Sequence, residues 1–248
     1  MNPLVVIPAR LASTRLPGKP LADILGRPMI VHVLDRARAA RIGPVAVACA
    51  DPEVAEVVRA AGGAAVLTEP DLPSGSDRVH AALAMLDPAC AHDVVVNLQG
   101  DFPAIRPEQL RAVLDPLADP AIDIGTLVAP IRDAEEAAAP SVVKAACAFA
   151  EGREVAPVLY FSRAAIPHGE GPRWHHIGIY AYRREALARF VALPESALER
   201  RERLEQLRAL EAGMRIGCAR IEHGPFGVDT PADLERARRE LAPASERR

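Results

Sequence analysis

Three cationic side chains follow the first apolar run of the chain in one short loop. Arg10, Arg15 and Lys19 come after Leu4–Ile7, a run long enough for one buried strand. Cations this close repel one another unless an anion lies among them. In an open α/β sheet, ligands bind in the loops that leave the carboxyl ends of the strands. The spacing therefore predicts a polyphosphate site, and an ordinary basic surface loop stays open as the alternative.

The loop differs from the two common phosphate-binding motifs. It lacks the G-x-x-x-x-G-K-[ST] spacing, and no G-x-G-x-x-G follows the apolar run. Its end, Pro17–Pro20, is conformationally restricted, because proline fixes φ while Gly18 permits a positive φ. The loop is thus a candidate for phosphate binding through side-chain charge.

Two aspartates stand where apolar segments end. Asp101 follows Val94–Leu98, and a carboxylate at the end of a buried strand is costly unless it meets a cation. Asp229 precedes Thr230-Pro231, a typical helix start. Next to a polyphosphate, this pair would suit Mg²⁺, which binds one or two carboxylates together with phosphate oxygens and water. A cap or turn role is the alternative for each residue.

A third candidate segment precedes a predicted helix. Ser74, Gly75 and Arg78 lie in Ser74–Arg78, where amides and hydroxyls could bind a base edge and the arginine could reach a phosphate. An ordinary helix N-cap explains the same residues equally well.

The second half of the chain supplies polar groups of another kind. An arginine, a histidine, a tyrosine and a Glu-Gln pair would suit a polyhydroxylated ligand that carries a carboxylate. For the glutamate, Glu205, a solvated helix pair with Arg208 is the alternative. The residues are Arg163, His176, Tyr180, Glu205 and Gln206.

Composition narrows the class of protein. The 248 residues carry a formal charge of −3, which argues against a general nucleic-acid or anionic-membrane binder. The four cysteines show no C-x-x-C pair, so we expect free thiols, and no apolar run reaches the length of a membrane span. With no signal-peptide pattern at the start, the cytoplasm is the expected compartment.

Apolar runs alternate with helical patterns through the first half, which predicts an α/β fold with a mostly parallel sheet. In the second half, strand patterns without helical crossovers predict an antiparallel region, followed by one helix over Leu198–Ala212. The expected strands are Leu4–Ile7, Val45–Ala50, Ala64–Leu67, Asp93–Leu98, Ile124–Pro130, Val142–Ala150, Val155–Phe161, Ile177–Arg183 and Arg215–Ile221.

Motifs along nearly the whole chain resemble those of the 3-deoxy-manno-octulosonate (Kdo) cytidylyltransferase family. The long first motif is the most specific of them. They are Ile7–Leu21, Gly26–Val33, Ser74–Arg78, Asn97–Asp101, Tyr160–Pro167, His176–Arg183, Leu204–Arg208 and Gly227–Leu234. One departure is Phe102, which stands where many relatives have glutamate.

The resemblance implies a Rossmann-like nucleotidyltransferase fold and a cytoplasmic, homodimeric enzyme of lipopolysaccharide biosynthesis that joins CTP and Kdo with Mg²⁺. It implies one domain over 1–248, with a CTP-binding half (1–130), a sugar-binding and dimerisation insertion (131–225) and a C-terminal part (226–248).

The same resemblance assigns roles to single residues. It places CTP at Ala9, Arg10, Lys19, Ser74, Gly75 and Arg78, with Arg15 in the same motif. It places Mg²⁺ at Asp101 and Asp229, and the sugar at Gln99, Arg163, His176, Tyr180, Glu205 and Gln206. Three alternatives stay open: 8-amino-Kdo as the substrate, a sialic acid as the substrate, and a non-catalytic nucleotide-binding protein.

Overall fold

The computed structural model describes residues 1–13 and 15–242, and the chain divides into two compact units. The first unit comprises Met1–Leu110 together with Pro225–Arg248, and the second comprises Arg111–Gly224. The chain therefore leaves the first unit once and returns to it near its end.

Four parallel strands form the sheet of the first unit. Their order is β5-β4-β1-β6, and each pair is in parallel register, for example Ile7 opposite Val47. Nearly every residue of β1 and β6 is buried, as expected for central parallel strands with both faces covered. The strands are β1 (Pro3–Ala9), β4 (Val45–Cys49), β5 (Ala64–Leu67) and β6 (Val94–Asn97).

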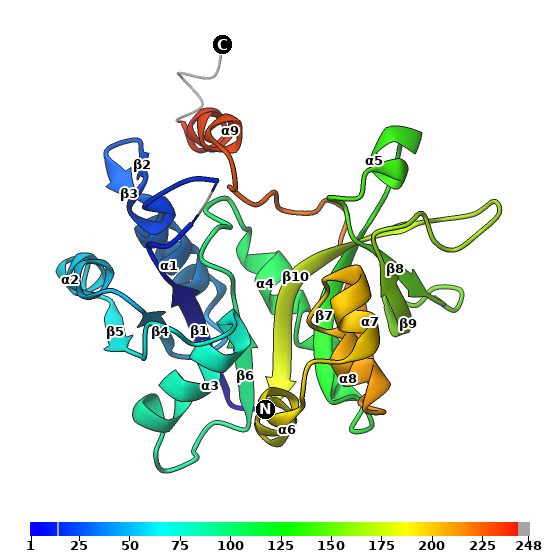
Figure 1. Ribbon diagram of the computed structural model, residues 1–248, viewed down its shortest axis with the longest axis horizontal. Coiled ribbons are helices and arrows are strands. Elements are labelled where there is room, and N and C mark those ends of the chain that lie inside the picture. The colour runs from blue at the N-terminus through cyan, green and yellow to red at the C-terminus, as the bar shows by residue number, and fades with distance from the viewer. Residues whose placement is uncertain (14, 243–248) are drawn as a thin grey trace. The chain divides into compact units, whose positions relative to one another are not determined.

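Helices connect these strands, and the last helix of the chain packs on the first unit (Figure 1). One core cluster joins the two ends of the chain: Ile24 and Met29 pack with Val228, Leu234 and Ala237. The elements are η1 (Lys19–Leu21), the hairpin strands β2 (Asp23–Ile24) and β3 (Arg27–Pro28), α1 (Met29–Ala40), α2 (Pro52–Ala60), α3 (Gly75–Leu86), α4 (Pro107–Ala112) and α9 (Pro231–Leu241).

The second unit is built on a five-stranded barrel. Its strand order is β10-β7-β11-β9-β8, and an additional pairing of β10 with β8 closes the ring. Only β11 and β7 pair in parallel, while the other pairs are antiparallel. The elements are η2 (Asp115–Ala118), β7 (Ile124–Pro130), α5 (Ala134–Ala138), β8 (Lys144–Cys147), β9 (Val155–Ser162), β10 (Trp174–Arg183), α6 (Arg184–Ala192), α7 (Ala197–Glu202), α8 (Leu207–Glu211) and β11 (Ile216–Arg220).

The expected α/β class is confirmed, but the expectation of a mostly parallel sheet is wrong for the chain as a whole. The all-parallel arrangement is restricted to the first unit, and the strand pairing is otherwise mixed and mainly antiparallel. In the second unit, β8 and β9 follow each other without a helix between them and pair in opposite directions, whereas a parallel pair needs a longer crossover connection.

The single helix predicted over Leu198–Ala212 is also wrong. Helix α7 ends at Glu202, the following residue Arg203 has a left-handed φ of 55°, and α8 starts only at Leu207. A buried ion pair fastens the two short helices, because the guanidinium of Arg208 contacts both carboxylate oxygens of Glu199. The broken geometry places Glu205 and Gln206 in the turn between the helices.

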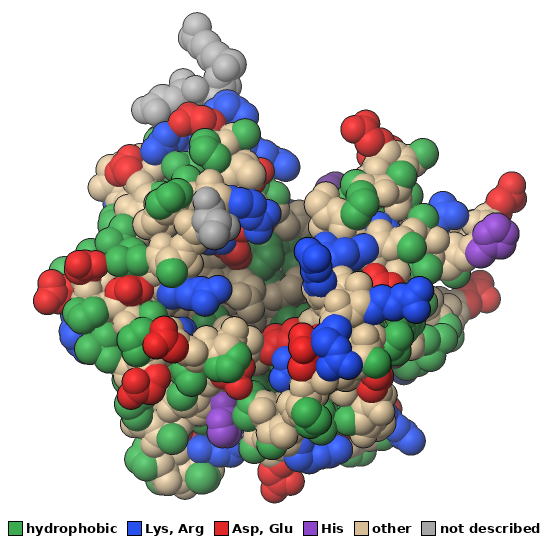
Figure 2. Space-filling model, viewed as in Figure 1, with side chains coloured by type: hydrophobic (Ala, Val, Ile, Leu, Met, Phe, Trp, Pro, Cys, Tyr) green, Lys and Arg blue, Asp and Glu red, His purple; other side chains and the backbone are tan. Residues whose placement is uncertain are grey.

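Acidic and basic side chains are interspersed on the face of the molecule in Figure 2. Among the described residues, no helix combines the length and the apolar character needed to cross a membrane.

Candidate active site

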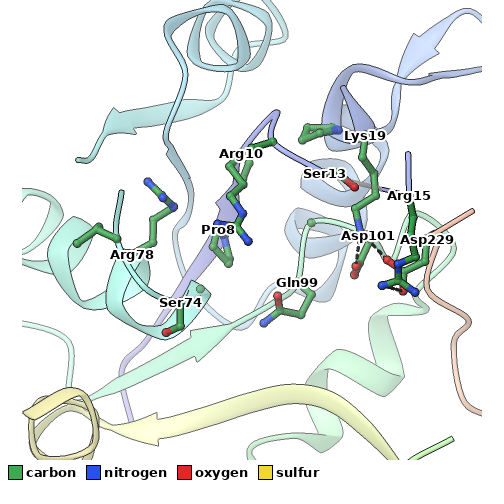
Figure 3. A pocket seen from close by; sticks show the side chains of 16 residues that line it. Pro8, Arg10, Ser13, Arg15, Lys19, Ser74, Arg78, Gln99, Asp101 and Asp229 are labelled. Carbon is green, nitrogen blue, oxygen red and sulfur yellow. Dashed lines mark hydrogen bonds and ion pairs between the residues drawn. The ribbon is translucent and has the colours of Figure 1, made fainter. Parts of the chain in front are cut away.

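Lys19 bridges the two aspartates that the sequence singled out (Figure 3). Its Nζ lies 2.8 Å from Asp101 Oδ2 and 3.0 Å from Asp229 Oδ1. The lysine occupies this place because Gly18, with a φ of 66°, turns the chain into the short helix η1, which begins at Lys19.

A backbone hydrogen bond holds the two aspartates near each other. The N–H of Val228 donates to the carbonyl of Asp101 at 2.9 Å, and the buried Val228 side chain belongs to the core cluster described above. After Asp229, Thr230 and Asp233 form a capping box at the start of α9. The carboxylates predicted as a pair are therefore brought together by packing of the chain's last segment.

The two carboxylates determine the charge state of Lys19. Burial alone would lower the pKa of Lys19, but Asp101 and then Asp229 outweigh it, so that pKa is raised and the ammonium is stabilised. Arg15 adds a second cation, with Nη2 at 3.1 Å from Asp229 Oδ2. Two cations and two carboxylates thus meet in one cluster.

Arg10 adds a further cationic side chain to the lining of the pocket. Within the part of the chain that the structure describes, its guanidinium has no ion-pair or hydrogen-bond partner, and the residue is exposed. The adjoining loop is fixed, since the N–H of Leu11 donates to Asp51 Oδ2 at 2.7 Å. Burial, and after it the positive charge of Arg10, lower the pKa of Arg78.

The N-terminus of α3 forms the opposite wall. Ser74 caps the helix by accepting a hydrogen bond from the N–H of Asp77, as the N-cap interpretation predicted. Gly75 begins the helix next to β1, and a Cβ there would lie 3.4 Å from Pro8 and 3.7 Å from Gln99 Oε1. This close packing directs the helix N-terminus at the same space as Arg10.

Arg78 has a different task from the one its charge suggested. The side chain is 2% exposed, and its guanidinium donates to the hydroxyl of Thr68 and to the carbonyls of Glu69 and Pro70. It lines the pocket, but the contacts present in the structure use it to hold the segment that leads into Ser74. The sequence before Ser74, an apolar strand followed by a Pro-rich loop, does not indicate that Arg78 would bind its backbone.

These groups surround one pocket of about 740 Å³, a volume typical of small-molecule sites. Figure 3 shows Arg10 and Lys19 extending into it from the segment after β1, with Ser74, Gln99 and Asp101 on neighbouring elements. Every lining residue belongs to the first unit: Pro8, Ala9, Arg10, Ala12, Ser13, Arg15, Lys19, Pro20, Leu72, Ser74, Gly75, Arg78, Gln99, Gly100, Asp101 and Asp229.

Asp101 and Asp229 are the residues here that could hold a metal ion. Among the described residues, no group of three or more His, Cys, Asp or Glu side chains is arranged to bind one. A pair of carboxylates that already converges on an ammonium matches the donor set of Mg²⁺, which completes its shell with phosphate and water.

The remaining candidates lie in the second unit, apart from Gln99. Arg163 is held by backbone carbonyls: Nε donates to Glu202 at 2.8 Å, Nη1 to Pro140 at 2.9 Å and Nη2 to Arg203 at 3.3 Å. These three acceptors are neutral carbonyl oxygens, and within residues 1–13 and 15–242 no carboxylate forms an ion pair with the guanidinium. The carboxylate of Glu202 instead accepts a hydrogen bond from the backbone N–H of Arg163 at 2.9 Å. Neutral carbonyls therefore orient the guanidinium, which suits an anion.

His176 and Tyr180 lie close together on β10. Their ring centroids are 5.5 Å apart, and Phe161 contacts the histidine edge to face at 4.7 Å. Burial and the neighbouring His175 lower the pKa of His176 to about 3, so the imidazole is neutral near pH 7. Burial, Tyr182 and Glu205 raise the pKa of Tyr180 well above its usual value, so its hydroxyl is protonated.

Glu205 and Gln206 belong to the same neighbourhood, because Glu205 acts electrostatically on Tyr180. Gln206 is 6% exposed, and its Nε2 has no hydrogen-bond partner among the described residues. An unpartnered buried donor is costly unless a ligand satisfies it. The structure thus brings together Tyr180, His176 and the turn before α8.

Sequence reasoning missed the residues that hold these candidates. Glu202 accepts hydrogen bonds from the Ser162 hydroxyl and the Arg163 N–H, and Thr126 contacts His176 Nε2 at 3.1 Å. The only available signal for Thr126 was a hydroxyl within the apolar run Ile124–Pro130.

Known proteins resemble the chain over almost its full length. The family model described as cytidylyltransferase matches residues 4–216. A 3-deoxy-manno-octulosonate cytidylyltransferase of Rhodospirillum centenum is 64% identical, with 98% of this chain and 94% of that protein covered. One from Rhodopseudomonas palustris is 63% identical, with 96% and 97% covered.

Solved structures agree with these relatives. The structure of CMP:2-keto-3-deoxy-manno-octonic acid synthetase complexed with CTP matches with a TM-score of 0.88 and 43% identity, over 97% of this chain and 98% of the other. A 4-diphosphocytidyl-2C-methyl-D-erythritol synthase shares the fold, with a TM-score of 0.65 and 15% identity over 98% and 100% of the chains. With the matched family model and these identities over nearly the full length, the chain belongs to the 3-deoxy-manno-octulosonate cytidylyltransferase family.

Proposed function

We propose that this protein transfers CMP from CTP to Kdo, giving CMP-Kdo and pyrophosphate for lipopolysaccharide biosynthesis. The observation that carries the proposal is the convergence of Lys19 and Arg15 on Asp101 and Asp229 at a pocket with Arg10 and a helix N-terminus in its walls. Phosphate transfer needs positive charge around the phosphates and carboxylates for a metal ion in the same place.

The nucleotide would bind between the loop after β1 and the start of α3. The amides around Ser74 and Gly75 are suited to hydrogen bonds with a base or a phosphate, and the guanidinium of Arg10 has no ion-pair partner among the described residues. Ala9 lines the same space as the last residue of β1. Arg78 supports this wall through its contacts with the segment 68–70.

Asp101 and Asp229 would hold Mg²⁺, and Lys19 would then turn from the carboxylates toward the phosphates. When bound, Mg²⁺ supplies charge neutralisation and polarisation at the α-phosphate. The donor set fits, because the two carboxylates already accommodate a cation between them.

The reaction would be an in-line displacement at the α-phosphorus. The anomeric hydroxyl oxygen of Kdo forms a new bond to phosphorus, the bond from phosphorus to the oxygen bridging to the β-phosphate breaks, and the hydroxyl proton leaves to solvent. Arg10, Arg15 and Lys19 would stabilise the charge that develops on the departing pyrophosphate.

We assign the acid sugar to Arg163, His176, Tyr180, Glu205 and Gln206 of the second unit. For Gln99, which lines the pocket of the first unit, a contact with the sugar stays a prediction. The guanidinium of Arg163, oriented by backbone carbonyls, suits the carboxylate of Kdo, while the neutral imidazole, the tyrosine hydroxyl and the buried amide suit its hydroxyl groups. In this proposal one part of the chain binds the nucleotide, an insertion binds the sugar and also forms a homodimer, and a C-terminal part binds the metal. The use of CTP makes the cytoplasm its compartment.

The test is to incubate the purified protein with CTP, Mg²⁺ and one acid sugar at a time and to measure pyrophosphate release. We expect release with Kdo. Release with 8-amino-Kdo or a sialic acid in place of Kdo would change the substrate, and absence of release with all three would contradict an enzymatic role. Omission of Mg²⁺ in a parallel reaction tests the metal requirement.

A further inference from the structure

The hydroxyl of Thr126 contacts three polar groups of the neighbouring strand β10. It lies 3.1 Å from His176 Nε2, 3.2 Å from the carbonyl of Ile177 and 2.9 Å from the carbonyl of Ile179. Thr126 itself is fully buried in β7. A buried hydroxyl with this many partners has a defined orientation.

These contacts fall where the pairing of β7 and β10 is irregular. Ile177 lies opposite Leu127, but Tyr180 already lies opposite Thr126, so β10 carries extra residues between them. Such a bulge re-aims the side chains around it. The Thr126 hydroxyl bonds carbonyls within the bulge and therefore holds it in place, between His176 on one side and Tyr180 on the other.

The direction of the hydrogen bonds follows from simple counting. A hydroxyl has one proton to give, and a carbonyl oxygen can only accept. The shortest contact is the one to the carbonyl of Ile179, so the hydroxyl donates there and accepts from His176. Nε2 of His176 must then carry the hydrogen, which leaves Nδ1 as the acceptor of the ring.

Neighbouring groups hold the ring and its strand in place. Phe161 and Tyr180 pack against the imidazole, and the backbone N–H of His176 donates to the carbonyl of Val143 at 2.8 Å. The ring is neutral near pH 7, as described above. Among the described residues, Nδ1 has no hydrogen-bond partner.

We propose that Thr126 is a positioning residue for the sugar site: its hydroxyl fixes His176 with Nε2 protonated, so that Nδ1 accepts a hydrogen bond from a hydroxyl of the acid sugar. This inference rests on the proposed function, because it assigns the ligand of Nδ1. It also predicts that the ligand's carboxylate is bound elsewhere, since a neutral acceptor cannot bind an anion.

Two variants test the role in steady-state kinetics. Thr126→Val keeps the shape and removes the hydroxyl, while Thr126→Ser keeps the hydroxyl. We expect Thr126→Val to raise the KM for Kdo about tenfold and to leave the KM for CTP within about twofold, with Thr126→Ser close to wild type. Leu127→Val, a buried change on the same strand, controls for general loosening of the barrel.

Equal effects of Thr126→Val on both KM values, a Thr126→Ser variant as impaired as Thr126→Val, or an unchanged KM for Kdo would overturn the proposal. Nitrogen-15 NMR of the His176 ring provides a readout that needs no turnover: we expect the hydrogen on Nε2 in the wild type, and a hydrogen on Nδ1 would refute the assignment. If the wild type releases no pyrophosphate with Kdo, the proposed function fails, while the NMR result still decides the tautomer.

Discussion

Removal of the Lys19 ammonium should expose the repulsion between the two carboxylates that it bridges. Since Nζ lies 2.8 Å from Asp101 Oδ2 and 3.0 Å from Asp229 Oδ1, these oxygens lie at most about 6 Å apart. Two negative charges at that distance repel by about 0.7 kcal/mol in bulk water and by about 3 kcal/mol at an effective dielectric constant of 20. Because the Asp229 side chain is 40% exposed, solvent screening favours the lower part of this range.

We therefore expect Lys19→Met to lower the free energy of unfolding by about 1 kcal/mol at neutral pH. Urea denaturation followed by circular dichroism measures this loss. Millimolar Mg²⁺ should restore most of it, because a divalent cation would replace the ammonium between the carboxylates. The pKa of Lys19 is raised in the folded protein, so the stability that its ammonium contributes depends on pH. This contribution is present below the usual lysine pKa of 10.5 and is lost as the pH rises through the folded-state pKa. The difference between wild type and variant should thus stay constant around neutral pH and shrink above 10.5.

Arg27→Met is the matched control, because it removes one exposed ion pair with Asp35, in which both side chains are about half exposed. We expect little change in its stability and no specific response to Mg²⁺. The reasoning would be refuted if Lys19→Met were as stable as the wild type, or if Mg²⁺ stabilised both variants equally.

Three further predictions concern single residues. Asp101→Asn should lower turnover by at least about 100-fold while CTP binding persists in calorimetry, and near-normal rates would remove Asp101 from the proposed metal site. The ammonium of the fully buried Lys144 donates to three backbone carbonyls, the longest contact being 2.9 Å. Lys144→Met should therefore lower the free energy of unfolding by about 1–3 kcal/mol in urea denaturation. An unchanged denaturation midpoint would contradict this. Because the pKa of His176 is lowered in the folded protein, the unfolded chain binds a proton more tightly than the folded one. The free energy of unfolding should therefore fall as the pH drops from 6.5 toward 3, and it should fall less steeply in His176→Gln. Equal slopes of stability against pH in the two proteins would show that another group is responsible.

Local sequence patterns were sufficient for much of the first unit. The alternation of apolar runs and helical stripes predicted β1, β4, β5 and the helices between them, because each of these elements depends on its own periodicity and on its caps. The Thr230-Pro231 start of α9 was likewise predicted and is confirmed by its capping box.

Local patterns failed where a distant contact decides the backbone. Leu198–Ala212 has a continuous helical pattern, yet the chain breaks at Arg203, and the buried pair of Glu199 with Arg208 fastens α7 to α8 across that break. In the same way, periodicity showed antiparallel strands in the second half but not the pairing of β10 with β8 that closes them into a barrel. Ring closure depends on all five strands at once, so no single segment encodes it.

By itself, the sequence determined which chemical groups this protein has and where along the chain they stand: a cationic loop after the first strand, two aspartates at strand and helix boundaries, and a polar set in the second half. Only the tertiary structure decided what each group contacts. It placed Lys19 between Asp101 and Asp229, the latter 210 positions away, and it turned Arg78 toward the backbone of its own unit. The physical reason is that charge and hydrogen-bonding partners are chosen by distance in space, which a local pattern does not contain.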